Sequence, residues 1–139
     1  MMTSVKLENL VRIGQLKKEP PRADELEGLK RSGLSRLSDA ERSDLTFDSR
    51  FDLAYNAAHA LALYMLRRMG YRSEHRYTVF QALGETAGLA PDHWRVLVKA
   101  HEKRNAAEYE GYLEQDERLL LDMLAVTRNL VDALPEDAP

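Results

Sequence analysis

Apolar residues recur every three or four positions along most of the chain, which is the spacing of one face of an α-helix. Seven glycines and five prolines are the main interruptions of this pattern. The chain is therefore predicted to be all-α. The apolar stripes predict successive helices at about 4–17, 23–40, 48–69, 76–87, 91–110 and 114–134.

Capping signals mark several of these boundaries. Asp48 is a suitable N-cap for the third helix, and Gly70 is a suitable left-handed C-cap for it. Pro91 suits the first position of the fifth helix, which is expected to end near Gly111. The dipeptide Ser32-Gly33 predicts a bend or a break within the second helix.

Short connections between the last four helices favour antiparallel neighbours. The predicted fold is an up-and-down four-helix bundle with additional N-terminal helices. We expect residues 1–44 to form a helical extension that packs on the bundle or contacts a partner, and residues 45–134 to form the bundle itself. Residues 135–139 are acidic and flanked by proline, so they are predicted to be a disordered tail.

Composition narrows the classes of function. The chain of 139 residues has no cysteine, which excludes disulfides, a zinc–thiolate site and a thiol nucleophile. No apolar run reaches the roughly 18 residues of a membrane span, and the first residues lack the apolar region of a signal peptide, so we expect a cytoplasmic protein without membrane contact. A net charge of −3 argues against nucleic-acid binding by the whole surface, so any phosphate recognition must be local.

The fifth predicted helix contains a face that changes from apolar to polar. The face begins with Trp94, Leu97 and Val98, which are ordinary core residues. Its later positions are polar or ionisable: His101, Arg104, Asn105, Glu108 and Tyr109. Polar groups directed towards a core are costly unless they have partners. This stretch is therefore the best local candidate for a functional site.

A second set of basic residues is expected at the same end of the bundle. An up-and-down arrangement places the end of the third helix, the start of the fourth and the end of the fifth at one pole. A guanidinium held by a carboxylate, beside an imidazole and a phenol, can orient a phosphate group. The predicted ligand-binding residues are Arg104, Asn105, Glu108, Tyr109, His75, Arg72 and Arg76. Alternatively, Arg104 and Glu108 form only a helical ion pair.

A further polar group follows one edge of the third helix. Asp52, Asn56 and His59 stand at positions i, i+4 and i+7, and together with His101 they form a secondary polar cluster. In a simple bundle the triplet lies away from Arg104, and only an antiparallel contact in a symmetric dimer would join the two sets. Both histidines also fit purely structural roles. The spacings of known metal and cofactor motifs are missing, so we expect no metal and no cofactor.

These residues carry a family resemblance. The order of the helices, the alanine-rich segment 51–60, the turn at His75 and the segment 104–109 (Arg-Asn-Ala-Ala-Glu-Tyr) make residues 45–134 resemble HEPN domains. HEPN domains are small helical bundles, often encoded beside nucleotidyltransferases in bacterial toxin–antitoxin pairs. The resemblance implies a homodimer, a nucleotidyltransferase-type partner protein, and RNA or a nucleotide as ligand.

The chain departs from the ribonuclease motif of that family. Many HEPN ribonucleases have an Arg, usually followed by a polar residue, and then a His a few residues later. Arg104 and Asn105 match the first half, but Tyr109 stands where the His is expected. A tyrosine, with a pKa of about 10, is a poor acid or base near neutral pH. The chain therefore looks more like HEPN branches that lack this motif.

The sequence thus favours a non-catalytic binding or regulatory component of a toxin–antitoxin-type system, which receives a nucleotide or RNA phosphate near Arg104. Two alternatives stay open. One is a metal-independent ribonuclease that uses Arg104 as a catalytic residue together with Tyr109, His75 or His59. The other is a non-catalytic protein–protein interaction module.

Overall fold

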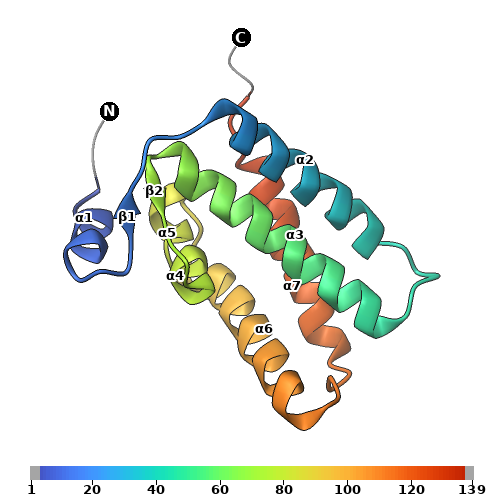
Figure 1. Cartoon of the computed structure of the whole chain (residues 1–139). Helices are drawn as coiled ribbons and strands as arrows, with labels where there is room; N and C mark the ends of the chain where they lie inside the picture. Colours follow the sequence, from blue (N-terminus) through green and yellow to red (C-terminus); the bar gives the residue numbers. More distant parts are fainter. Residues whose placement is uncertain (1–3, 137–139) are drawn as a thin grey trace.

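The computed structural model of the chain describes residues 4–136, which are mostly helical (Figure 1). The all-α prediction is confirmed at that level. Two short strands, β1 and β2, add a small antiparallel ribbon. In chain order the elements are α1 (Val5–Arg12), β1 (Lys17–Lys18), α2 (Ala23–Ala40), α3 (Phe47–Arg68), β2 (Tyr71–Arg72), α4 (Arg76–Gln81), α5 (Leu83–Thr86), α6 (Pro91–Glu110) and α7 (Glu117–Asp132).

Helix α3 is the central element. It packs against α2, α4, α5, α6 and α7. In Figure 1 α2 and α3 lie side by side, and α7 runs behind α3. Alanines at 54, 57, 58 and 62 of α3 are buried, and their small side chains let the neighbouring helices approach closely. The core of the structure is therefore built along α3.

Several predicted helix ends differ from those observed. Thr46, not Asp48, caps α3, because its hydroxyl accepts a hydrogen bond from the amide of Ser49 at 3.2 Å. Helix α1 ends at Arg12, because Gly14 adopts a left-handed φ of +82° and turns the chain towards β1. The predicted fourth helix is two short helices, α4 and α5, that meet at Ala82.

The predicted break at Ser32-Gly33 is wrong, since α2 continues from Ala23 to Ala40. Gly33 instead marks the closest approach of α2 to α3. A Cβ atom at this position would lie 2.6 Å from the side chain of Leu61 and 3.4 Å from the carbonyl oxygen of Ala57. Glycine therefore provides space for Leu61, which is fully buried.

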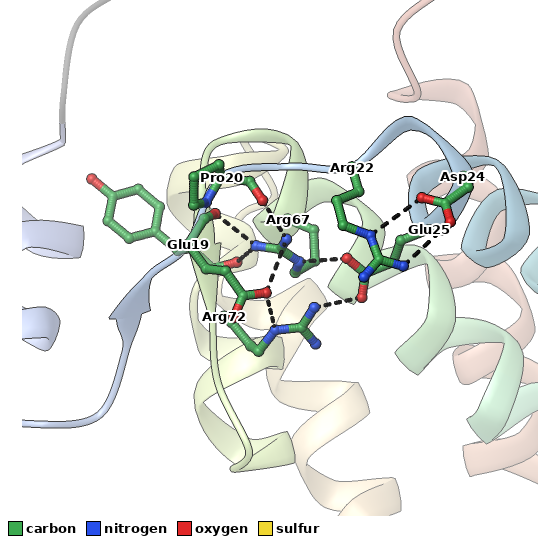
Figure 2. A network of polar contacts seen from close by, with 8 residues as sticks. Glu19, Pro20, Arg22, Asp24, Glu25, Arg67 and Arg72 are labelled. Carbon is green, nitrogen blue, oxygen red and sulfur yellow. Dashed lines mark hydrogen bonds and ion pairs between the residues drawn. The ribbon is translucent and has the colours of Figure 1, made fainter.

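A buried arginine joins the N-terminal segment to the bundle (Figure 2). Arg67, at the end of α3, is 0% exposed, and all three of its side-chain nitrogens have partners. It donates to the carboxylate of Glu25 on α2 at 2.9 Å, to the carbonyl oxygens of Glu19 and Pro20, each at 2.9 Å, and to that of Tyr71 at 3.1 Å. These bonds hold the linker before α2, the start of α2 and β2 together.

The ribbon was not predicted, because two residues per strand are too few for an alternating pattern. Lys17 pairs with Arg72, and Lys18 pairs with Tyr71. The predicted disordered tail falls largely on residues 137–139, which lie outside the described residues. Among residues 4–136, no helix has the length and apolar character needed to cross a membrane.

The close approach at Gly33 gives a stability prediction. Gly33→Ala should lower the free energy of unfolding by about 1–3 kcal/mol, because the added methyl group displaces Leu61 in a packed core. Gly28→Ala is the matched control: it lies in the same helix with no heavy atom near its added Cβ, and should raise stability by about 0.5–1 kcal/mol. Urea unfolding of both variants measures the difference, and equal effects would contradict the packing described here.

Candidate functional site

The candidate site is built around Tyr55, a buried residue in the middle of α3 that is 1% exposed. Two guanidinium groups lie over its ring. The Cζ atom of Arg104, from α6, is 4.9 Å from the ring centroid, and that of Arg76, the first residue of α4, is 5.3 Å away. An aromatic face attracts cations, so both positive charges are held at the same ring.

Residues of α3 fix the two arginines in place. Arg104 Nε donates to the Asp52 carboxylate at 3.2 Å, and Arg76 Nη1 donates to the Asn56 side-chain oxygen at 3.4 Å. Within residues 4–136, Arg76 has no carboxylate in ion-pairing distance, and Arg104 pairs with Asp52 rather than with Glu108. Of the two guanidiniums, only that of Arg104 is paired with a carboxylate in the described part of the chain, so the pair carries excess positive charge. The Arg104–Glu108 ion pair, considered above as an alternative, is not formed.

His101, on α6, also contacts Tyr55. Its Nδ1 atom is 2.7 Å from the Tyr55 hydroxyl, and its Nε2 atom is 3.2 Å from the amide nitrogen of Asn105. The imidazole and phenol rings are nearly parallel, with centroids 6.1 Å apart. Both ring nitrogens of His101 are therefore engaged by the protein. Burial and the nearby charge of Arg76 lower the pKa of His101, which favours its neutral form.

His59 is a second neutral imidazole beside this cluster. Its ring packs edge-on against Phe80 of α4, with centroids 5.9 Å apart. Burial, followed by the positive charges of Arg76 and His101, lowers the pKa of His59 from 6.5 to about 4. His59 thus has a packing role, and its uncharged state avoids further repulsion with Arg76.

The polar face of α6 and the polar edge of α3, which were predicted to lie apart, meet within one chain. The expectation that Asp52, Asn56 and His59 lie away from Arg104 was wrong, because Arg104 pairs directly with Asp52. The physical reason is the path of residues 70–75. After α3 this segment runs back along the helix, so α4 begins beside Tyr55 rather than at the end of α3 (Figure 1).

The predicted ligand-binding residues divide into two groups. Arg104, Asn105 and Arg76 gather at Tyr55. The remaining members of the predicted set do not join them in any contact of the described residues: Arg72, His75, Glu108 and Tyr109.

Arg72 belongs to the network of Arg67, at the other end of α3 (Figure 2). It donates to Glu19 and Glu25, each at 2.6 Å, so its charge is already matched. His75 lies in the turn before α4, where its amide donates to Ser73. The prediction that Arg72 lies at the same end of the structure as Arg104 was therefore wrong. The end of α6 lies beside the first half of α3, whereas Arg72 lies beyond the last residue of α3.

Glu108 and Tyr109 lie on the exposed side of α6, and Tyr109 is 90% exposed. Tyr55 was not among the site residues predicted from the sequence. The available signal was its hydroxyl, because a buried tyrosine usually needs a hydrogen-bond partner. Across residues 4–136 there is no group of three or more His, Asp or Glu side chains that could hold a metal ion.

Comparisons of the chain with protein-family models, curated proteins and solved structures found no match. The HEPN resemblance therefore rests on the sequence features described above, and the function is argued from the side chains around Tyr55. These side chains combine two guanidiniums, one carboxylate, two neutral imidazoles and two amides. This is the chemistry of a site that binds an anion through hydrogen bonds and charge.

The low pKa of His59 predicts a pH dependence of stability. The unfolded chain binds a proton at His59 below about pH 6.5, whereas the folded chain resists it until about pH 4. The free energy of unfolding should therefore fall by roughly 1–2 kcal/mol between about pH 8 and pH 5, allowing for the partial exposure of this ring. Urea unfolding at the two pH values measures the change.

His59→Gln is the control variant for this pH effect. It cannot take up the proton, so the stability of the variant should depend less on pH over the same range. Measurements above about pH 5 exclude most of the titration of carboxylates. An unchanged slope in His59→Gln would contradict the buried, neutral state of this side chain.

Proposed function

We propose that the chain binds phosphate groups of RNA or of a nucleotide at the arginine pair formed by Arg76 and Arg104. The observation that carries the proposal is the convergence of both guanidiniums on Tyr55, where among the described residues Arg104 has one carboxylate partner, Asp52, and Arg76 has none. Like charges held close together repel each other, and a bound anion relieves this repulsion. A guanidinium also matches the geometry of two phosphate oxygens.

The two arginines are held in place before a ligand binds. Hydrogen bonds from the arginines to Asp52 and Asn56 fix their planes before a ligand arrives. The side chain of Arg104 is 34% exposed, so it stays accessible while its orientation is held. A preformed fork loses little conformational entropy when it binds, which raises affinity.

Binding without cleavage is the form of this function that we favour. His101 has both ring nitrogens occupied by Tyr55 and Asn105, and a general base needs a free nitrogen within reach of the proton it takes. His59 packs against Phe80, and Tyr109 points away into solvent. No free acid–base pair among the described residues stands beside the two guanidiniums.

The resemblance of residues 45–134 to HEPN domains supports the choice of ligand, because many members of that family act on RNA. We extend the proposal to a HEPN-like bundle that acts as a homodimeric, cytoplasmic, regulatory or binding component of a toxin–antitoxin-type system. A nucleotidyltransferase-type protein is its proposed partner. The arginine pair would then recognise the phosphates of the RNA or nucleotide on which that system acts.

Replacement of the arginines tests the site. Arg104→Ala and Arg76→Ala should each weaken binding of a fluorescent single-stranded RNA by about tenfold in an anisotropy titration, since each removes a charge-assisted contact. Each should also reduce the slope of log affinity against log salt by about one unit. Arg118→Ala, an exposed arginine on α7, makes the same change in net charge and should leave binding unchanged.

Equal effects of the three substitutions would contradict a localised phosphate site and favour general charge attraction. Circular dichroism of each variant confirms that it is folded. Incubating the labelled RNA with EDTA and the wild-type chain separates binding from cleavage. Cleavage that is lost in both Arg104→Ala and His101→Ala would overturn the non-catalytic form of the proposal.

A further inference from the structure

A cavity of about 430 Å³ lies where α1, α5 and the beginning of α6 meet. Its volume is in the range of pockets that hold small molecules. The apolar part of its lining includes Leu10, Leu89, Pro91 and Trp94, and the polar part includes Lys6, Asn9, Gln81 and Glu85. The N-terminal helix thus supplies one wall of a pocket that the bundle alone would leave incomplete.

The polar groups of this cavity differ in how far they are already paired. Lys6 and Glu85 lie 3.6 Å apart, and the Ser4 hydroxyl donates to Glu85 at 3.1 Å, so the two charges compensate each other. In the described part of the chain, the side-chain amides of Asn9 and Gln81 and the indole N–H of Trp94 make no hydrogen bond. The cavity therefore offers neutral donors and acceptors beside an aromatic wall, which suits an uncharged heteroaromatic ring.

Gly84 keeps space open beside the indole. A Cβ atom at this position would lie 3.5 Å from Trp94 Nε1 and 3.7 Å from the carbonyl oxygen of Leu89. The backbone of Gly84 does not have a positive φ, so its conformation alone does not require glycine. The missing side chain leaves the indole N–H reachable from the cavity.

We propose that this cavity binds a nucleobase, with adenine preferred. The proposal rests on the proposed function, since it assigns a base site to the ligand whose phosphate meets the arginine pair. Bases stack on tryptophan, and the side-chain amides of Asn and Gln pair with the hydrogen-bonding edge of adenine. Gln81 ends α4 and Arg76 begins it, so one residue of each site lies on this helix, about 7.5 Å apart along its axis.

Trp94 is the only tryptophan of the chain, so its fluorescence reports on this cavity directly. Adenosine should change Trp94 emission saturably when excitation is at the red edge of the indole band, where adenosine does not absorb. Gly84→Ala should weaken this binding by about tenfold, because its methyl group covers the indole N–H. Asn9 and Gln81 are both exposed, so Asn9→Ala and Gln81→Ala should leave the fold intact and each weaken adenosine binding by roughly fivefold.

Gly28→Ala is the matched control for Gly84→Ala, because its methyl group meets no other part of the protein, and it should bind adenosine like wild type. A wild-type chain whose Trp94 emission responds neither to adenosine nor to oligoadenylate would overturn the proposal. Equal adenosine affinity of Gly84→Ala and wild type would do the same. Uridine tests the preference for adenine. It should bind more weakly than adenosine, and equal affinity for the two nucleosides would contradict the preference.

The test separates this inference from the phosphate site. Adenosine has no phosphate, so Arg104→Ala should bind it as wild type does, while oligoadenylate should bind more weakly to this variant. If adenosine binds but wild type and Arg104→Ala bind oligoadenylate equally well, the phosphate site is contradicted and the base site is supported. If oligoadenylate depends on Arg104 but Trp94 never responds, the phosphate site stands and the base site fails.

Discussion

The structure depends on the burial of one charged side chain, Arg67. A guanidinium removed from water is tolerated only when its donors have partners, because an unpaired buried charge costs several kcal/mol. Arg67 meets this condition with Glu25, with backbone carbonyls of Glu19 and Pro20, and with the carbonyl of Tyr71. Since these partners belong to three segments of the chain, satisfying Arg67 determines how the segments sit relative to α3 (Figure 2).

This constraint extends to the candidate site through the segment that follows β2. With Tyr71 bound to Arg67 and paired with Lys18, the chain leaves α3 along a defined path. Residues 73–75 then bring α4 back to the level of Tyr55, where Arg76 and Arg104 both lie over the ring. The arginine pair is therefore a product of topology, since its members come from helices that are separate in sequence.

The sequence predicted well those features that depend on nearby residues. Helical periodicity gave the main helices, Pro91 gave the start of α6, and Gly70 and Gly111 have the left-handed conformation expected after a helix. The break between α4 and α5 was not predicted, because Ala82 itself is neither glycine nor proline and the helical spacing of apolar residues continues across it from Phe80 to Leu83.

The candidate site was predicted only in part, because it depends on contacts between distant segments. The polar turn of α6 correctly drew attention to Arg104, but its partner Asp52 depends on which half of α3 lies alongside. The direction of the connection after Gly70 decides this, and its five residues, 71–75, are of mixed polarity and do not reveal a direction. For the same reason Arg72 was predicted to be a ligand-binding cation, although its carboxylate partners lie more than forty positions earlier in the chain.

Nitrogen-15 NMR of the arginine side chains tests the central claim most directly, because each Nε–H group reports on its own surroundings. A titration with a short single-stranded RNA should shift the signals of Arg76 and Arg104 in parallel and leave that of Arg67 unchanged, since Arg67 is buried and fully paired. Shifts at Arg118 or other exposed arginines, without shifts at Arg76 and Arg104, would contradict a phosphate site at Tyr55.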